Sequence, residues 1–493
     1  MDAISLQQVC EFVDGRVVGD VPQRLPIITG VVRGSDDVKP GYLFIALRGE
    51  KHDGHSFLPA AAAAGAVAAL VDHVPGQVPP VSSLAVPAGR LDASNPPVGT
   101  PVALHAVAPA DLALIQVADT RKAMGRLAHG IRMGMKSTVI GVGGSNGKTG
   151  TKHLIDSVLC RQLRGTFSPK SFNNDIGVPL AIFAADPQHD YLVLELGTNH
   201  PGEIRTLTHM ARPDVAVITN CSEEHLEGLG NIDGVRKEEA SIIEGLNPAG
   251  LLVVNGADPK LLEAVAAYPG RRVTFGASQT NDLYATDIRC DFEGVEFLLN
   301  GETRVYLPLL GKHTAINALA AIAVARHFGL SNEEIADGLA LAHGPEMRLQ
   351  ILRLGSATIV NDAYNANPAS MQAAIETLAA LSCHGRRIAI LGDMRELGGQ
   401  TDDAHRRMGE FVASTSLDLL ICVGEKAAII AAEARNRGFA AEWVLQYPDT
   451  LSAAAAIPPL ISPGDLVLLK ASRFMRLEQI AHAIEGMPAR RSA

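Results

Sequence analysis

Short runs of apolar residues recur along the chain and alternate with segments of helical periodicity. In the middle of the chain these runs occupy 137–142, 191–196, 214–219 and 251–256, and in the last third they occupy 356–364, 387–393, 417–424 and 465–472. Continuous apolar runs of this length are typical of parallel strands that are covered on both faces. The pattern therefore predicts α/β units built on mostly parallel sheets.

The first part of the chain has its own pattern. Strand-like runs at 41–47 and 68–74 are joined by a polar loop rich in Gly and His, and a strand followed by an amphipathic helix is expected at 112–132. The segment 74–110 is rich in Pro, Ala and Gly, which is typical of an insertion or extended loop. A length of 493 residues suits about three domains. We place them at 1–135, 136–344 and 345–493.

Composition and charge narrow the class of protein. The net charge of −10, without a block of like charge, argues against a nucleic-acid-binding surface. Six scattered cysteines fit a reducing compartment. The first residues lack the basic and apolar parts of a secretory signal, and the Ala-rich run at 58–74 is too short to cross a bilayer. We expect a soluble, cytoplasmic protein with no nucleic-acid partner and no membrane span.

The stretch VIGVGGSNGKTGTK, residues 139–152, is the strongest chemical signal. The common phosphate loop G-x-x-x-x-G-K-[ST] would have its first glycine at position 142, where Val142 stands. The context is nevertheless strand, glycine-rich loop, Lys148, Thr149 and helix, which presents backbone N–H groups and a helix dipole to an anion. We expect Lys148 to reach the outer phosphates and Thr149 to bind Mg²⁺. The alternative is a glycine turn with a surface lysine.

Two later apolar runs end on side chains that suit the same site. Glu195 closes one run and His225 follows another. A carboxylate at the end of a buried strand is costly unless it is paired or bound to a metal. Ligands of open parallel sheets bind beyond the carboxyl ends of the strands. Taken singly, each residue would more often be structural, but together with the loop they predict metal or phosphate binding.

These residues, as a set, resemble the Mur ligases, the ATP-dependent amino-acid-adding enzymes of peptidoglycan synthesis. Their loop has the form G-x-x-G-[ST]-x-G-K-[ST], which this chain matches at Gly141, Gly144, Ser145, Gly147, Lys148 and Thr149. Folylpolyglutamate synthases share that loop. Longer motifs at 171–182, 195–204, 361–371, 392–398 and 468–478 resemble Mur ligases more specifically. The resemblance covers nearly the whole chain except 74–110 and the last few residues.

The resemblance implies a fold and an activity. The fold is a small N-terminal α/β domain that binds UDP, a central ATPase domain with a phosphate loop, and a Rossmann-like C-terminal domain. The activity is an ATP-dependent, ADP-forming ligation of UDP-MurNAc-tripeptide to D-Ala-D-Ala through an acyl phosphate, with ATP and Mg²⁺ as cofactors and a monomer as the working unit. Two alternatives stay open: the family member that adds the third residue, diaminopimelate or lysine, and a non-catalytic nucleotide-binding relative.

The resemblance also assigns residues to roles. It implies catalytic or metal-binding roles for Lys148, Thr149, Glu195 and His225, with Glu239 or Lys237 beside them. ATP contacts are implied for Gly144, Ser145, Asn146, Gly147, Lys148, Thr149, Asn317, Arg348 and Asp362. Substrate contacts are implied for Ser35, Asp53, His55, Asn173, Asn174, Asn199, His200, Tyr364, Asn365 and Asn367. For Asn317 the alternative is a solvated helix face, and for Asn365 and Asn367 it is a turn before Pro368.

Two departures from the family pattern affect these expectations. The first unit has Ser35-Asp36 where the family usually has Ser-Arg, and an aspartate repels a diphosphate. The carbamylated lysine that the family uses for a second Mg²⁺ is expected at position 239, where this chain has Glu239, while Lys237 stands two residues earlier. Positions i and i+2 of a helix point to different faces. We expect Glu239 to supply the carboxylate directly; the alternative is a local shift that brings in Lys237.

Overall fold

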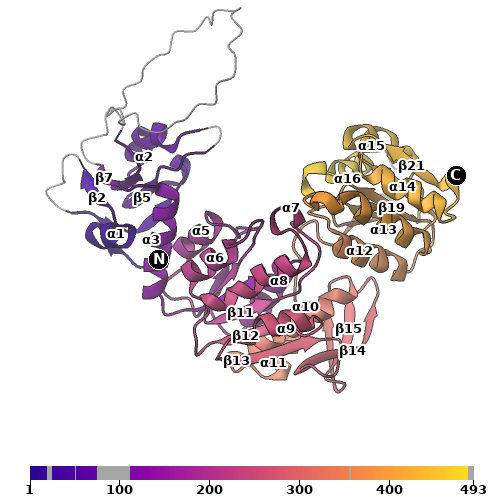
Figure 1. Cartoon of the computed structure of the whole chain (residues 1–493), viewed down its shortest axis with the longest axis horizontal. Coiled ribbons are helices and arrows are strands. Elements are labelled where there is room, and N and C mark those ends of the chain that lie inside the picture. Colours follow the sequence, from indigo (N-terminus) through magenta and orange to yellow (C-terminus); the bar gives the residue numbers. More distant parts are fainter. Residues whose placement is uncertain (19–24, 50–51, 75–111, 355–356, 487–493) are drawn as a thin grey trace, which may run out of the picture. The chain divides into compact units, whose positions relative to one another are not determined.

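The computed structural model describes residues 1–18, 25–49, 52–74, 112–354 and 357–486 (Figure 1). The chain divides into two compact units. Unit 1 comprises Met1–Met135 with Pro179–Pro187, and unit 2 comprises Lys136–Val178 with Gln188–Ala493. The predicted insertion at 74–110, apart from Val74, lies outside the described residues. Within the described part of the chain, no helix has the length and apolar character needed to cross a membrane.

Unit 1 is a small α/β unit. Its main sheet has the order β2 (Arg16–Val18), β7 (Ala113–Gln116), β6 (Ala68–Val71), β5 (Tyr42–Ile45) and β4 (Gly30–Val32), and only β2 pairs antiparallel. A short antiparallel pair joins β1 (Ile4–Ser5) to β3 (Ile27–Ile28). The helices are α1 (Leu6–Val13), α2 (Leu58–Ala63) and α3 (Thr120–Gly134). The Ala-rich run thus forms α2, of which only Leu58 and Ala61 are buried, and leads into β6.

The first part of unit 2 is built on a nine-stranded sheet. Its parallel strands are β9 (Gly165–Phe167), β10 (Tyr191–Glu195), β8 (Thr138–Gly143), β11 (Val215–Ile218), β12 (Leu251–Asn255) and β13 (Arg271–Gly276). Helices α4 (Lys148–Leu159) and α10 (Lys312–His327) share one apolar core with these strands. The other helices are α6 (Glu203–Ala211), α7 (Leu226–Leu229), α8 (Ile232–Ala240), α9 (Pro259–Ala264) and α11 (Asn332–Ala340), while α5 (Gly177–Ala184) crosses the boundary between the units.

An antiparallel ribbon extends this sheet beyond β13. Strand β14 (Leu283–Cys290) is parallel to β13 and antiparallel to β15 (Val295–Leu299), which pairs antiparallel with β16 (Thr303–Leu307). The sequence patterns did not predict these three strands. Buried and partly exposed residues alternate along β15, because only one face of the ribbon meets the core, so no continuous apolar run marks it.

The last part of unit 2 has a six-stranded sheet with helices on both faces. The order is β17 (Gln350–Leu354), β18 (Ala357–Asn361), β22 (Leu466–Lys470), β19 (Arg387–Gly392), β20 (Leu419–Val423) and β21 (Val444–Tyr447), and only β17 is antiparallel. Helices α12 (Pro368–Ala380), α13 (Thr401–Ala413) and α14 (Ala427–Asn436) pack on one face, and α15 (Thr450–Ala456) and α16 (Glu478–Glu485) on the other. The four predicted runs form β18, β19, β20 and β22, and the predicted α/β fold class is confirmed.

Candidate active site

The phosphate loop joins β8 to α4, and its backbone explains the unusual glycine spacing. Gly144 and Gly147 have φ of 112° and 84°, a left-handed region that favours glycine. A Cβ at Gly144 would overlap Thr219, and one at Gly147 would lie 2.8 Å from Asn317 Oδ1. Val142 is instead a buried residue of β8. The strand continues through position 142, so no glycine is needed there.

The residues that follow β11 hold the loop in place. Thr219 Oγ1 and Asn220 Nδ2 donate to the carbonyl oxygen of Asn146 at 2.6 and 2.8 Å. Asn146 N donates to Asn220 Oδ1 at 3.1 Å, and Ser222 N donates to Ser145 Oγ at 2.9 Å. The loop is therefore held in place by the residues at the end of the neighbouring strand.

Lys148 opens α4 and lies among three carboxylates. Its Nζ donates to the carbonyl oxygens of Gly144 and Ser145 at 2.5 and 2.9 Å, and it lies 3.7 Å from Glu224 Oε1. Burial alone would lower the pKa of Lys148, but Glu224, Glu239 and Glu195 outweigh that effect and raise it. The ammonium group thus stays charged at the loop.

Glu195 ends β10 and is 1% exposed. Its Oε2 accepts hydrogen bonds from Thr149 Oγ1 at 3.0 Å and from Lys152 Nζ at 3.3 Å, and its Oε1 accepts from Asn173 Nδ2 at 3.0 Å. Lys152 is fully buried and also donates to the carbonyl oxygens of Ser168 and Lys170. Sequence reasoning missed Lys152; the only signal was its place one helical turn after Lys148.

Glu239 reaches the same loop from α8. It is fully buried, and its Oε2 accepts a hydrogen bond from Gly144 N at 2.6 Å. No hydrogen-bond partner for Oε1 is found among the described residues. Burial raises the pKa of Glu239 to about 7, an effect that Lys148 opposes and Glu224 reinforces. Lys237 is exposed on the same helix, in a groove that Asp233 and Lys260 also line.

His225 faces a residue from the last part of the chain. Its Nδ1 lies 2.5 Å from Glu396 Oε2. Burial would lower the pKa of His225, but Glu396 and Glu224 outweigh it and raise that pKa. Lys148 acts on the ring electrostatically in the opposite direction and lowers this pKa. Glu396 belongs to the GDMRELG motif, for which the sequence implied no role.

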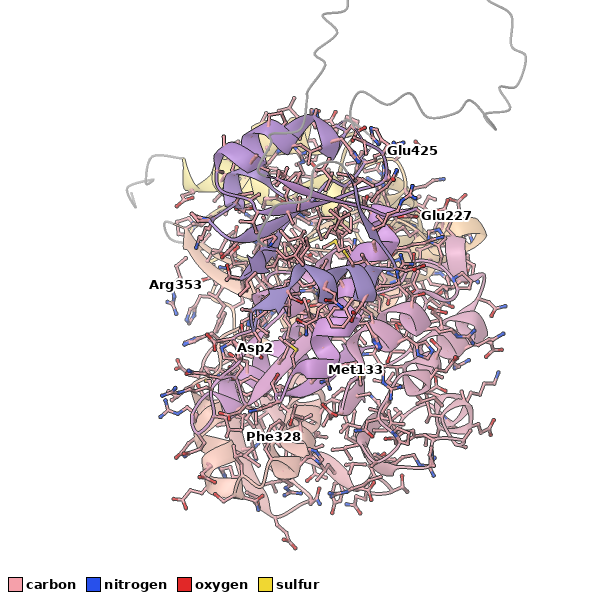
Figure 2. All side chains as sticks on the ribbon, turned by 90° about the vertical axis from the view of Figure 1, so that its left-hand side faces the viewer. Asp2, Met133, Glu227, Phe328, Arg353 and Glu425 are labelled. Carbon is pink, nitrogen blue, oxygen red and sulfur yellow. The ribbon has the colours of Figure 1, made fainter. Side chains whose placement is uncertain are left out.

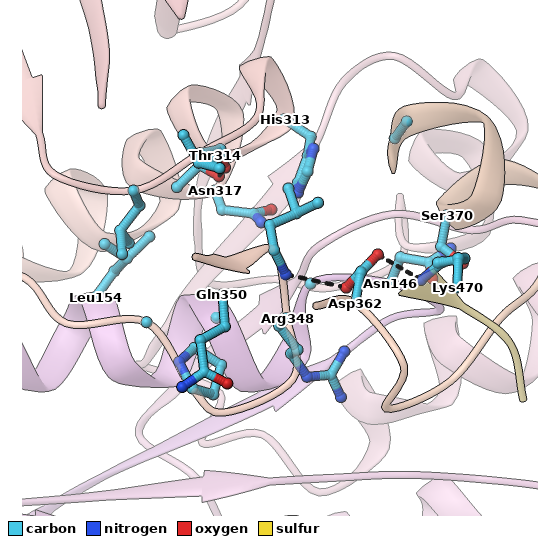
Figure 3. Close-up of a pocket in the computed structure, with 18 of the residues that line it drawn as sticks. Asn146, Leu154, His313, Thr314, Asn317, Arg348, Gln350, Asp362, Ser370 and Lys470 are labelled. Carbon is cyan, nitrogen blue, oxygen red and sulfur yellow. Dashed lines mark hydrogen bonds and ion pairs between the residues drawn. The ribbon is translucent and has the colours of Figure 1, made fainter. Parts of the chain in front are cut away.

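A cavity of about 460 Å³ opens beside the loop (Figure 3). Asn317, Arg348 and Asp362 line it together with Asn146 and Gly147. Asn317 is 8% exposed, so the alternative of a solvated helix face is wrong. The cavity brings together residues that lie far apart in the sequence.

Charged groups fix two of the cavity walls. Arg348 donates to Thr149 Oγ1 at 3.2 Å, and its guanidinium lies 4.4 Å from the ring centre of Tyr364. Asp362 accepts from Leu349 N at 3.2 Å and pairs with Lys470 Nζ at 2.7 Å (Figure 3). Burial lowers the pKa of Lys470, and Asp362 partly offsets that effect.

The asparagine-rich segment has both structural and site contacts. Asn367 caps α12 by accepting from Ser370 N at 2.9 Å, and its Nδ2 donates to Asn146 Oδ1 at 2.9 Å and to Glu224 Oε2 at 3.1 Å. Asn367 is therefore a turn residue that also contacts the loop, and its contact with substrate stays a prediction. Asn365 is exposed, and its carbonyl oxygen accepts from Lys470 at 2.7 Å. The hydroxyl of Tyr364 donates to Ser171 Oγ at 2.7 Å.

The other predicted substrate residues of unit 2 have local contacts. Asn174 Oδ1 accepts from Gly177 N at 2.9 Å, which shapes the turn before α5. Asn199 and His200 are exposed, and their backbone N–H groups donate to Glu203 Oε2 at 2.6 and 3.1 Å. These three residues therefore differ from Asn173, the predicted substrate residue whose side chain donates to Glu195.

Of the three predicted residues of unit 1, Asp53 and His55 contact each other. Ser35 opens a short turn of 3₁₀ helix, and Asp36 is exposed. Asp53 Oδ1 lies 2.6 Å from Nδ1 of the buried His55, whose Nε2 accepts from Asp72 N at 3.2 Å. Arg48 Nη2 donates to Asp72 Oδ1 at 2.9 Å. Position 36 carries Asp36 where the family usually has an arginine. Arg48 nevertheless supplies a positive charge near the segment Asp53–His55.

Comparison with known proteins identifies the family. Sequence models match residues 27–132 (Mur ligase family, catalytic domain), 142–325 (Mur ligase middle domain) and 347–473 (Mur ligase, glutamate ligase domain). The UDP-N-acetylmuramoyl-tripeptide–D-alanyl-D-alanine ligase of Bacillus subtilis is 36% identical over 98% of this chain and 99% of its own length. The chain belongs to the Mur ligase family. It groups there with the UDP-N-acetylmuramoyl-tripeptide–D-alanyl-D-alanine ligases, as the motifs predicted.

Solved structures of Mur ligases agree with this assignment. MurF from Acinetobacter baumannii superposes with a TM-score of 0.83 at 28% identity, covering 99% of this chain and 100% of the other. MurF from Thermotoga maritima, solved in complex with ADP, superposes with a TM-score of 0.76 at 25% identity, covering 92% and 97% of the two chains. The Mur ligase fold therefore extends over both units of this chain.

Proposed function

We propose that this Mur ligase joins D-Ala-D-Ala to the carboxylate that ends UDP-MurNAc-tripeptide, with conversion of ATP to ADP. One observation carries the proposal: Lys148, Thr149 and Glu195 meet at a phosphate loop that opens on a cavity of about 460 Å³. The substrate carboxylate attacks the γ-phosphate to form an acyl phosphate. The dipeptide amine then attacks the acyl carbon, and inorganic phosphate leaves.

ATP has a place for each of its parts in this arrangement. The N–H groups of the loop and Lys148 bind the phosphates, since a helix N-terminus and an ammonium both attract anions. Asn317, buried beside Gly147, contacts the adenine. Asp362 accepts from the ribose hydroxyls, and Arg348 extends from the cavity wall toward the phosphates.

The side chains around the loop fit Mg²⁺, which prefers oxygen ligands. The hydroxyl of Thr149 and the carboxylate of Glu195, 3.0 Å apart, would hold one ion. A second would be held by His225 and by Oε1 of Glu239, which has no hydrogen-bond partner among the described residues, in place of the family's carbamylated lysine. The exposed position of Lys237 speaks against its use. When bound, Mg²⁺ neutralises charge on the transferring phosphoryl group.

We assign the remaining roles by domain. Residues 1–135 bind the UDP group through Ser35, Asp53 and His55, residues 136–344 bind ATP, and residues 345–493 complete the site. Asn173, Asn174, Asn199, His200, Tyr364, Asn365 and Asn367 serve the peptide substrates. The protein works as a cytoplasmic monomer on small-molecule substrates.

Phosphate release from ATP tests the proposed reaction. We expect release with UDP-MurNAc-tripeptide to depend on D-Ala-D-Ala, and mass spectrometry to find the pentapeptide product. The matched control supplies UDP-MurNAc-dipeptide with diaminopimelate or lysine and should give no release. Release in that control alone would identify the third-residue-adding activity, and no release in either would support a non-catalytic protein.

A further inference from the structure

The loop at 392–398 lies against the start of α7. It follows β19, and it brings Glu396 Oε2 to 2.5 Å from Nδ1 of His225. The backbone carbonyl of Glu396 accepts a hydrogen bond from Glu227 N at 3.2 Å. A Cβ on Gly398 would lie 3.3 Å from Cα of Glu227, so the two backbones are close. The Glu227 side chain itself is exposed (Figure 2).

Both partners of this contact have a left-handed backbone. His225 has φ of 51° and Glu396 has φ of 65°. Residues other than glycine rarely adopt this region, and where they do the surrounding structure must hold them there. Two such residues from different parts of the chain face each other here, which indicates that the surrounding structure enforces this contact.

The side chain of His225 is mostly buried, with 17% exposed, and its Nδ1 faces the carboxylate of Glu396. No other hydrogen-bond partner for Nδ1 is found among the residues that the structure describes. The carboxylate of Glu396 is therefore placed to fix which ring nitrogen carries the proton, by charge and close contact. A histidine that binds a metal through one nitrogen generally needs a carboxylate or carbonyl at the other nitrogen to fix its tautomer.

We infer that Glu396 is a positioning residue for His225, an inference that rests on the proposed function. Glu396 keeps the proton of the neutral imidazole on Nδ1 and leaves Nε2 as the ligand for the second Mg²⁺. The carboxylate acts through the histidine and does not touch substrate.

This contact connects the metal ligand to the C-terminal part of unit 2. Two further hydrogen bonds join the same two parts of unit 2. Arg407 Nη2 donates to Glu223 Oε2 at 2.7 Å, and Asn367 Nδ2 donates to Asn146 Oδ1 at 2.9 Å. His225 therefore gains its orientation only when the 392–398 loop is docked on α7.

The test compares Glu396→Ala and Glu396→Gln with Glu410→Gln. Glu410 is a matched control, because its side chain is 52% exposed against 55% for Glu396, and it pairs with Arg437 at 3.0 Å. Mn²⁺ replaces Mg²⁺, and its binding is followed by electron paramagnetic resonance with a non-hydrolysable ATP analogue. We expect Glu396→Ala to lower the affinity for the second Mn²⁺ ion about 10–100-fold and to lower kcat by a similar factor. The affinity for the first Mn²⁺ ion and the KM for UDP-MurNAc-tripeptide should stay within about twofold of the parent values.

A second readout needs no metal. Two-dimensional ¹H–¹⁵N spectra of histidine-labelled protein, recorded above the raised pKa of His225 so that the ring is neutral, should show protonation at Nδ1 in the parent and a shift toward the Nε2-protonated tautomer in Glu396→Ala. An unchanged second Mn²⁺ site, or equal weakening of both sites, would overturn the inference. Dipeptide-dependent phosphate release by the parent and by Glu410→Gln would show that the proposed function stands even then.

Discussion

Two buried carboxylates border the phosphate loop, and their surroundings differ. Glu195 has hydrogen bonds from Thr149, Lys152 and Asn173, which satisfy both of its oxygens. Glu239 has one backbone N–H and an oxygen without a hydrogen-bond partner in the described part of the chain. Glu195 is therefore held in place by hydrogen bonds to both oxygens, whereas the charge on Glu239, whose pKa is raised, depends on what binds beside it.

The largest effect should come from Glu195→Gln. It removes the charge of the preorganised carboxylate, and loss of one such electrostatic contact typically costs about 10²–10³ in kcat. We expect dipeptide-dependent phosphate release to fall about 10³-fold. Glu244→Gln, which removes one partner of an exposed pair with Arg205, should leave the rate unchanged. A fall of less than tenfold for Glu195→Gln would contradict the assigned role.

Lys152→Met should destabilise the protein, because Lys152 pairs with the buried Glu195. It leaves a buried carboxylate without its cation and two carbonyl oxygens without a donor, so the free energy of unfolding should drop by about 3 kcal/mol. Urea denaturation measures the change. Lys260→Met is the control, because Lys260 is exposed and its pair with Asp233 is worth little, about 0.5 kcal/mol. Equal changes for the two variants would argue against the buried pair.

On the other side of the loop, Glu239→Gln should lower kcat by about 10–100-fold, the range typical for a weakened metal site. Lys237→Gln should stay within about twofold, since that side chain is exposed on the same helix. Removal and return of bicarbonate should change neither the parent nor Lys237→Gln. Rescue of a bicarbonate-starved parent enzyme would show instead that a carbamylated lysine is used.

The smallest effect is a pH dependence of the free energy of unfolding, measured with no nucleotide or Mg²⁺ added. The pKa of Glu239 rises from its ordinary 4.5 to about 7 on folding. The folded state then binds more protons than the unfolded state in this window, so Glu239 makes the free energy of unfolding fall as pH rises. The loss should be about 1.5 kcal/mol between about pH 5.5 and pH 7. Glu239→Gln should lack this component in urea titrations, and an identical slope would contradict the raised pKa.

Most of the sheet architecture could be predicted from the sequence. Strands buried on both faces, such as β8 and β20, need apolar residues at every position and therefore appear as continuous runs. The ribbon β14–β16 was missed because one of its faces is partly exposed. Its alternating pattern is weaker than a continuous run.

The candidate site was predictable where chemistry follows a strand end. Glu195 and the loop around Lys148 were found this way. Lys152 and Glu224 were missed because their partners lie far away in sequence, and nothing local distinguishes a buried lysine from an exposed one. Glu396 was noticed only as part of a motif. Its contact with His225 depends on how two parts of unit 2 pack, which sequence spacing does not encode.

Asn367 has a consequence for how occupancy of this site could be observed. One side chain both closes the first turn of α12, through Ser370 N, and contacts Asn146 in the phosphate loop. A nucleotide that changes the Asn146 contact therefore changes how readily that turn opens. Amide hydrogen exchange at Ser370 reports such local opening. The first turn of α12 is thus an intrinsic reporter of loop occupancy, readable without a label on the ligand.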